Sequence, residues 1–393
     1  MKIKTVIGKN FGDEGKGLAV NRFAQEAKKA GENTLVIRHN GGAQAGHTVD
    51  LKDGRFIFHQ LSSGSFAGAD TLWSETYLPD LYKVGEEMEQ FAAVSGSVPR
   101  IYADSMCRCT YIDDILINMA LEMSRGANRH GSCGMGINEC VERSAKMPLR
   151  LGKVVGMTVR ELFSEFKNIR RNYLPYRLND LGLDLNNAGE YGELLQSDDV
   201  LWGAAEQMIR NVSLIGLFDN NTDRYDNIIF EGAQGLLLDE FYLRYEPHLT
   251  TSRTGSVNPA DYFRKHFAGK EMELVYITRT YVTRHGNGPL PYRDRSYTEK
   301  YNIVDLTNSP NPWQGTMRFA PHGNMEEFLE PVCEDIENVK DIPHKTSLLI
   351  THINETNGNI CTSAGEIPVN DFIKELSGRE IFDNIYTSDS KYR

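Results

Sequence analysis

The stretch Gly12-Asp13-Glu14-Gly15-Lys16-Gly17 decides the fold, because it joins a short β-type run, Lys4–Gly8, to a helical pattern, Gly17–Ala30. Its glycines let backbone N–H groups approach an anion, and the N-terminus of the following helix adds positive potential. Lys16 adds a point charge. The stretch therefore predicts a strand–loop–helix unit that binds phosphate groups.

This loop differs from the common phosphate loop, which reads G-x-x-x-x-G-K-[S/T]. Gly8 lies seven residues before Gly15, and Gly17 follows Lys16, so no hydroxyl stands there for Mg²⁺. A carboxylate, Asp13, lies inside the loop instead. We therefore expect metal binding and acid–base chemistry in one place.

A second glycine-rich segment follows, Asn40-Gly41-Gly42-Ala43-Gln44-Ala45-Gly46-His47-Thr48. Taken alone, an aspartate at a helix start is most often an N-cap, and a Gly-His-Thr is most often a turn with a surface histidine. Together, and beside Gly15-Lys16-Gly17, the two segments favour a functional interpretation.

Alternation of strand and helix patterns indicates an α/β protein with a mainly parallel central sheet covered by helices. The β-type runs are Lys4–Gly8, Thr34–Arg38, Asn227–Phe230, Glu273–Val282 and Ser347–Ile353, with helical patterns at Gly17–Ala30 and Leu81–Phe91. The stretch Leu162–Val212 reads as helical scaffold, and Tyr292–Pro312 as a mobile surface loop. We expect one domain, residues 1–393, P-loop-NTPase-like with loop and helical elaborations.

Composition limits the classes of function. A net charge of −11 argues against a general nucleic-acid binder, which needs a basic face. No run of about 18 apolar residues appears, so we expect no membrane span, and the N-terminal strand is too brief for a signal sequence. The six cysteines are scattered without zinc-site spacing, which favours a reduced, cytoplasmic location.

Several segments resemble the adenylosuccinate synthetase family and its relatives that act on other purine nucleotides. That family pairs a G-D-E-G-K-G loop with a later A-G-H-T, and both stand here unaltered as Gly12–Gly17 and Ala45–Thr48. Further family-like segments follow in family order: Gly134-Met135-Gly136-Ile137, Phe230-Glu231-Gly232-Ala233-Gln234-Gly235 and Thr283-Arg284-His285-Gly286-Asn287-Gly288-Pro289.

The resemblance implies an ATP- or GTP-dependent ligase that attaches L-aspartate to C6 of a 6-oxopurine nucleotide. The carbonyl oxygen must first become a phosphate ester, so a base takes the N1 proton and cations neutralise developing charge. By position, Asp13 resembles the base and His47 the acid, with Lys16 and Gln234 also catalytic. Mg²⁺ would bind Asp13 and the Gly46 carbonyl.

The resemblance also implies binding residues and a homodimer. Nucleoside triphosphate and metal would contact Gly12, Asp13, Glu14, Gly15, Lys16, Gly17, Gly46, His47, Thr48, Arg318 and Asn354. The purine nucleotide and amino acid would contact Gln44, Ser132, Cys133, Lys146, Gln234, Thr250, Thr316 and Arg318. Ser132 and Cys133 replace two family threonines near the 5′-phosphate, and Lys146 replaces an arginine that reaches a neighbouring subunit.

Two departures from the family pattern concern the co-substrates. Members that use GTP carry a Lys-x-Asp whose aspartate binds guanine, whereas the aligned run here is Thr351-His352-Ile353-Asn354. Asparagine donates as well as accepts, so ATP or dATP is expected to serve at least as well as GTP. In the run 313–319, Thr316 replaces one carboxylate-binding arginine and Arg318 retains another, so the amino acid could bind more weakly or differ from aspartate.

Further departures concern the purine. Met135 stands in place of a family arginine, and Gln44 in place of a shorter asparagine, which hints at dGMP or GMP. Phage-type relatives that aminate deoxyguanylate typically have serine in place of the loop aspartate, but this chain keeps Asp13. IMP is the best single guess. A catalytically silent nucleotide-binding regulator is the alternative of a different class, disfavoured because Asp13 and His47 are both present.

Overall fold

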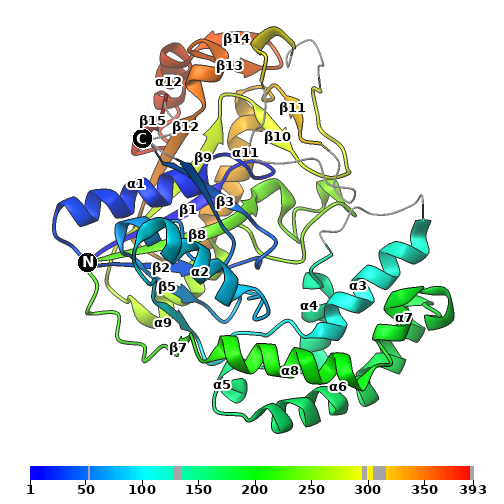
Figure 1. The fold of residues 1–393 in the computed structure, drawn as a ribbon. Coiled ribbons are helices and arrows are strands. Elements are labelled where there is room, and N and C mark those ends of the chain that lie inside the picture. The colour runs from blue at the N-terminus through cyan, green and yellow to red at the C-terminus, as the bar shows by residue number, and fades with distance from the viewer. Residues whose placement is uncertain (52–53, 127–133, 294–298, 304–315, 390–393) are drawn as a thin grey trace.

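A nine-stranded sheet forms the centre of the computed structural model, which describes residues 1–51, 54–126, 134–293, 299–303 and 316–389 (Figure 1). All its pairings are parallel, which confirms the predicted sheet type. Across the sheet the strands are β15 (Asn384–Thr387), β12 (His344–Thr351), β9 (Met272–Arg279), β1 (Lys2–Gly8), β8 (Asn227–Gly235), β2 (Thr34–Arg38), β5 (Asp70–Trp73), β6 (Ile101–Ala103) and β7 (Gly216–Leu217).

Helices cover both faces of this sheet, because side chains alternate between the faces along each strand. On one face, Val6 of β1 packs in a cluster with Ala24 of α1 (Lys16–Lys29). On the other face, Ile7 belongs to a larger cluster. That cluster includes residues of α9 (Val257–His266), α11 (Met325–Ile336) and α12 (Val369–Ser377). Both sides of β1 are therefore buried, which fixes the loop that follows it.

A group of helices lies beside the β5–β6 end of the sheet (Figure 1). It comprises α3 (Ile112–Arg125), α4 (Ile137–Lys146), α5 (Leu151–Val154), α6 (Val159–Leu181), α7 (Glu190–Leu194) and α8 (Asp198–Val212). One apolar cluster joins Trp73 of β5 to Phe166 of α6 and Met208 of α8, and also includes residues of α2 (Val84–Ser95). The predicted helical stretch Leu162–Val212 is confirmed. No helix within the described ranges is long and apolar enough to cross a membrane.

Three two-stranded ribbons extend from the main layers. They are β3 (His47–Leu51) with β4 (Gly54–Phe58), β10 (Val282–Arg284) with β11 (Arg318–Ala320), and β13 (Asn359–Thr362) with β14 (Gly365–Pro368). The predicted strand Glu273–Val282 is in fact two, since β9 ends at Arg279 and the chain resumes as β10. Ser132, Cys133 and most of the predicted loop Tyr292–Pro312 lie outside the described residues.

Candidate active site

Because the central strands are parallel, their carboxyl ends meet at one edge of the sheet, where ligands of α/β proteins bind. The loop Gly12–Gly17 follows β1, and residues 39–48 follow β2. Residues 232–235 form the end of β8, and Thr351 ends β12. The fold thus gathers the sequence-predicted glycine segments at one place.

The phosphate-type loop is held in shape mainly by Glu14. Its Oε1 accepts the backbone N–H groups of Asn10 and Gly12, both at 2.9 Å. Lys16 Nζ lies 3.6 Å from Glu14 Oε2, and both side chains are buried. Gly15 has a φ of 101°, and α1 starts directly after it with no acidic residue in its first turn. No acidic side chain in the first turn therefore neutralises the positive end of the α1 dipole.

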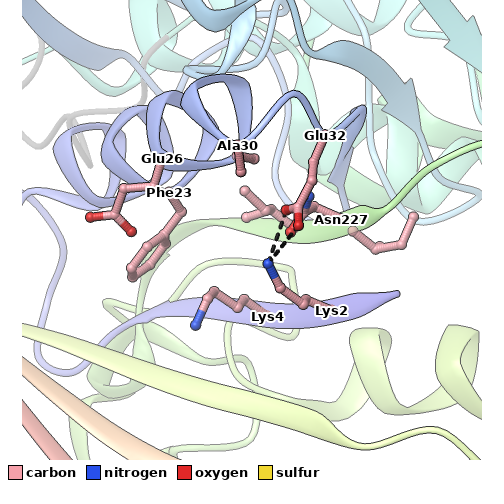
Figure 2. A pocket seen from close by; sticks show the side chains of 10 residues that line it. Lys2, Lys4, Phe23, Glu26, Ala30, Glu32 and Asn227 are labelled. Carbon is pink, nitrogen blue, oxygen red and sulfur yellow. Dashed lines mark hydrogen bonds and ion pairs between the residues drawn. The ribbon is translucent and has the colours of Figure 1, made fainter.

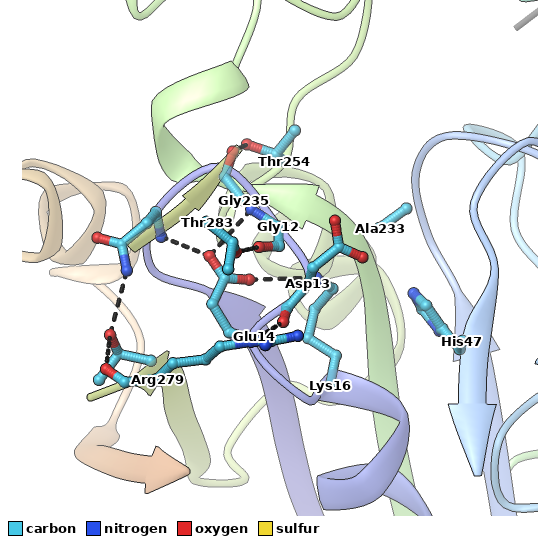
Figure 3. Close-up of polar contacts among 12 residues, drawn as sticks. Gly12, Asp13, Glu14, Lys16, His47, Ala233, Gly235, Thr254, Arg279 and Thr283 are labelled. Carbon is cyan, nitrogen blue, oxygen red and sulfur yellow. Dashed lines mark hydrogen bonds and ion pairs between the residues drawn. The ribbon is translucent and has the colours of Figure 1, made fainter. Parts of the chain in front are cut away.

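Asp13 has an unusual backbone conformation for a residue with a side chain, with φ at 62°. Its carbonyl oxygen accepts from Arg279 Nε at 2.6 Å, and the Gly12 carbonyl accepts from Thr283 Oγ1 at 2.9 Å (Figure 3). Within the described residues the Asp13 carboxylate makes no hydrogen bond. Few residues other than glycine adopt this region of backbone φ and ψ angles. Such a conformation, together with a carboxylate that has no hydrogen-bond partner, is typical of a functional position.

His47 is buried and bound to a second acidic residue. Its Nδ1 lies 2.6 Å from Glu231 Oε1, and Glu231 also accepts from the Ser63 N–H at 3.1 Å and the Ser63 hydroxyl at 2.5 Å. Burial lowers the pKa of His47 to about 4, although the Glu231 charge opposes this. For Glu231, burial alone would raise the pKa, but the charges and hydrogen bonds of His47, Arg38 and Ser63 lower it.

The two predicted motifs touch each other at Gly17. A methyl group placed on Gly17 would lie 3.0 Å from the Thr48 carbonyl oxygen and 3.2 Å from His47 Cβ. Figure 3 shows the Asp13 carboxylate and the His47 ring facing the same space, with Lys16 below them. The structure therefore brings Asp13, Lys16 and His47 together.

A second contact joins the segment after β2 to the end of β8. The Asn40 amide accepts from the Ala233 N–H at 2.7 Å and donates to the Ala233 carbonyl at 3.0 Å. Gln234, the next residue, has a φ of 61°. The buried atoms Gln44 Oε1, Gln234 Oε1 and His47 Nε2 have no partner within the described residues. Buried polar atoms are normally hydrogen-bonded, so these three atoms are candidates for hydrogen bonds to a bound ligand.

The other predicted residues differ in how close they lie to this centre. Thr250 binds through its backbone N–H to the Leu238 carbonyl, just after the β8 end. Asn354 is exposed on the turn that follows β12. Thr351, the last residue of β12, donates its hydroxyl to the Glu14 carbonyl at 2.7 Å.

Lys146 lies elsewhere, at the end of α4, with Nζ 3.3 Å from the centroid of the Tyr176 ring on α6.

Arg318 and Thr316 lie at the start of β11. Arg318 donates to the Gly288 carbonyl at 2.7 Å and the Gly286 carbonyl at 2.6 Å, so its guanidinium fastens the loop after β10. Thr316 is exposed. A role for either residue in binding an amino acid stays a prediction.

Sequence reasoning missed the residues that support the site. Glu231 was noted only as part of a family-like segment, and Arg279 and Asn40 were given no role. Glu231 is buried in the middle of β8, directly before the glycine-containing end of that strand. A buried carboxylate needs a partner, so this position could have suggested a link to a histidine.

The loop fits a magnesium ion that is shared with phosphate groups. Within the described residues no cluster of three or more histidine, cysteine or acidic side chains is present, so the protein offers no complete cage. Mg²⁺ is usually bound by one or two carboxylates together with substrate phosphates. The Asp13 carboxylate, which faces the open space of the site, matches that arrangement.

A hollow at the opposite edge of the sheet has different chemistry (Figure 2). It is lined by residues at the amino ends of β1 and β8 and along α1. Its lysines are already paired, Lys2 with Glu32 at 2.8 Å and Lys4 with Glu273. Neither cation is available for a ligand, so the candidate site is the one at the carboxyl edge.

Comparisons with known proteins agree on one family. A family model described as adenylosuccinate synthetase matches residues 5–305. An adenylosuccinate synthetase of Thermosipho africanus is 28% identical over 298 residues, covering 74% of this chain and 66% of that protein. One from Aliivibrio fischeri is 29% identical over 324 residues, covering 79% of this chain and 67% of that protein. The match thus spans about two thirds of these relatives.

Two solved structures share the fold. The fully ligated adenylosuccinate synthetase of Plasmodium falciparum has a TM-score of 0.65 at 18% identity, covering 92% of this chain and 79% of that one. The succinoaminodeoxyadenylate synthetase of cyanophage S-2L, bound to dGMP and dATP, has a TM-score of 0.62 at 13% identity. It covers 99% of this chain and 93% of that one.

Proposed function

Because the chain belongs to the adenylosuccinate synthetase family, we propose that it joins the amino group of L-aspartate to C6 of a 6-oxopurine nucleotide. IMP is the first substrate to test, and adenylosuccinate would be the product. A nucleoside triphosphate supplies the driving force by phosphorylating O6 before the amine displaces phosphate, and Mg²⁺ is required. The conclusion is supported most by the free Asp13 carboxylate and the unpartnered His47 Nε2 beside one phosphate loop.

Asp13 acts as the base that removes the N1 proton of the purine. Its carboxylate has no competing hydrogen bond within the described residues, and Arg279 and Thr283 hold the backbone that carries it. Removing the proton places negative charge on O6, which then attacks the γ-phosphorus. A carboxylate inside the phosphate loop brings the base and the phosphoryl group within reach of each other.

His47 acts as the acid and stabilises charge during transfer. Burial holds its pKa low in the free site, and the negative charge of bound phosphates would raise that pKa and so protonate Nε2. Glu231 binds Nδ1, so Nε2 is the ring atom presented to the reacting groups. A carboxylate in this position fixes the orientation of the ring and stabilises its protonated form, as in other carboxylate–histidine pairs. We therefore add Glu231 to the site as a positioning residue.

Lys16 and the N–H groups of residues 15–17 bind the phosphates. Asp13 and the Gly46 carbonyl would hold Mg²⁺, which would supply charge neutralisation. Lys16 now lies beside Glu14 Oε2, and phosphate oxygens would satisfy its remaining donors. We propose that Asn354 contacts the base of the triphosphate, because Thr351 joins the preceding residues to the phosphate loop. An asparagine there favours ATP or dATP over GTP.

We propose that Gln234 and Gln44 bind the purine nucleotide and that Arg318 binds the carboxylate of the amino acid. Both glutamine oxygens are buried without a partner in the described residues. Lys146 lies away from this centre within one chain. Its proposed contact therefore requires a homodimer, which sedimentation of the purified protein tests.

The experiment is a substrate panel with released phosphate as the readout. Protein with Mg²⁺ and ATP or GTP is incubated with aspartate and IMP, GMP or dGMP. Phosphate release that requires both a nucleotide and aspartate is expected, and its absence in every combination would refute the ligase. Use of dGMP rather than IMP would establish the second candidate, which the larger Gln44 and the uncharged Met135 favour.

A further inference from the structure

A second pocket lies behind the phosphate loop, formed by the residues before the loop, α11 and the segments around 242–245 and 290–292. Its volume is about 100 Å³, and its lining contains none of the residues proposed to bind substrates or metal. Phe11, Tyr245 and Phe328 are buried aromatic residues of its wall. Phe11 and Tyr245 meet edge to face with centroids 5.0 Å apart, so these walls form a rigid apolar surface.

Lys9 is a buried cation of this pocket, and its ammonium has more hydrogen-bond donors than it has acceptors. Its side chain is only 1% exposed, and Nζ has one hydrogen-bond acceptor in the described structure, Asn10 Oδ1 at 3.2 Å. The ammonium also lies 3.8 Å from the centroid of the Phe328 ring. An ammonium has three donors, and burying a charge without a counter-ion is costly.

The other polar groups of the pocket have partners. Glu330 binds Arg244 at 3.1 Å, and both oxygens of Glu327 accept the Tyr292 hydroxyl at 2.8 Å. His322 Nε2 lies 3.0 Å from the Arg279 carbonyl, to which it donates. Lys9 is therefore the polar group in this pocket that a ligand would satisfy.

We propose that this pocket binds a small planar aromatic carboxylate, with the carboxylate on Lys9 and the ring among Phe11, Tyr245 and Phe328. A carboxylate supplies both the negative charge and the two acceptor oxygens that the buried ammonium lacks. A flat ring fits walls that are themselves aromatic, because edge-to-face contacts form without moving them.

Benzoate is the probe, with benzyl alcohol as its neutral counterpart, and binding to the full chain is measured by NMR titration without nucleotide. We expect benzoate to bind with a dissociation constant on the order of 1 mM and at least about ten-fold more tightly than benzyl alcohol. Cross-peaks should connect the benzoate ring to Phe11 and Tyr245. Equal affinity for the two probes, or no binding, would overturn the proposal.

Lys9→Met keeps the length of the side chain and removes its charge, so it should weaken benzoate binding at least about ten-fold. Lys2→Met, an exposed lysine in the other hollow, is the matched control and should leave the affinity unchanged. Undiminished binding by Lys9→Met contradicts the proposal. The contrast between benzoate and benzyl alcohol in the wild-type protein needs no variant, and neither test depends on whether the chain is a ligase.

Discussion

His47 Nδ1 and Glu231 Oε1 lie 2.6 Å apart in a buried pair that joins the start of β3 to the middle of β8. Ser63 also binds the carboxylate: its hydroxyl donates to the same Oε1, and its N–H donates to Oε2. The orientation of the ring is therefore set by residues far apart in the sequence, and the position of Nε2 depends on Glu231.

Glu231→Gln should lower kcat on the order of 10²-fold while changing KM for the nucleotides little, because it leaves the phosphate loop in place. Steady-state kinetics measure this effect. Glu334→Gln, at an exposed acidic residue of α11, is the control and should match the wild type. A Glu231→Gln variant with wild-type kcat would show that the pair has no part in the reaction.

Gly17→Ala tests the contact between the two motifs. The new methyl group would meet the Thr48 carbonyl oxygen at 3.0 Å and His47 Cβ at 3.2 Å, so the segment that carries His47 must move. We expect kcat to fall at least about ten-fold, since small displacements of catalytic groups are costly. Gly203→Ala, in α8 with open space around it, should instead keep full turnover. Full activity of Gly17→Ala would mean that the two motifs act independently.

Asn354→Asp should shift the preferred triphosphate towards GTP. A carboxylate accepts from the guanine N1–H and 2-amino groups, whereas an amide can also donate to adenine. The ratio of kcat/KM for ATP to that for GTP should fall about ten-fold or more. An unchanged ratio would remove Asn354 from base recognition.

Lys9 should make stability depend on pH. Burial lowers its pKa from the ordinary value to about 7, although the Glu14 charge opposes this, and buried His322 also faces it. Below pH 7 both folded and unfolded chains carry the proton, so the folded state bears the full cost of the buried charge. As pH rises from 7 towards 10.5, the folded state gives up the proton and the cost falls.

Lys9→Met removes that cost. We expect it to raise the free energy of unfolding on the order of 3 kcal/mol at pH 6, with a gain that shrinks as pH approaches 10. Urea unfolding at a series of pH values measures this. A stabilisation that does not change with pH, or a loss of stability at pH 6, would contradict the assigned environment of Lys9.

The sequence was sufficient to predict the parallel sheet and the place of the loop. Thr34–Arg38 is found as predicted, and β1 and β8 contain the predicted runs, because each of these central strands has a buried apolar run in its middle. The outer strands β6, β7 and β15 were missed. They have only two to four residues each, too few for a periodic pattern to stand out.

The glycine-rich motifs were sufficient to predict the location of the site. They did not predict the residues that hold the catalytic groups in position. Gly12, Gly15 and Gly17 occupy positions where a turn or a close approach excludes other residues, so they stand out in the sequence. Glu231 and Arg279 act through contacts across the sheet, which no local pattern encodes. The placement of Lys146 over Tyr176 likewise depends on how α4 packs on α6.

The central claim is that Asp13 and His47 act on one bound purine, so that its O6 leaves as part of phosphate. Its most direct test uses the accepted purine nucleotide labelled with ¹⁸O at O6, and mass spectrometry of the phosphate released in the presence of aspartate. The account predicts that each released phosphate carries one ¹⁸O and that Asp13→Ala abolishes the transfer. Phosphate without the label, released in step with product, would contradict it.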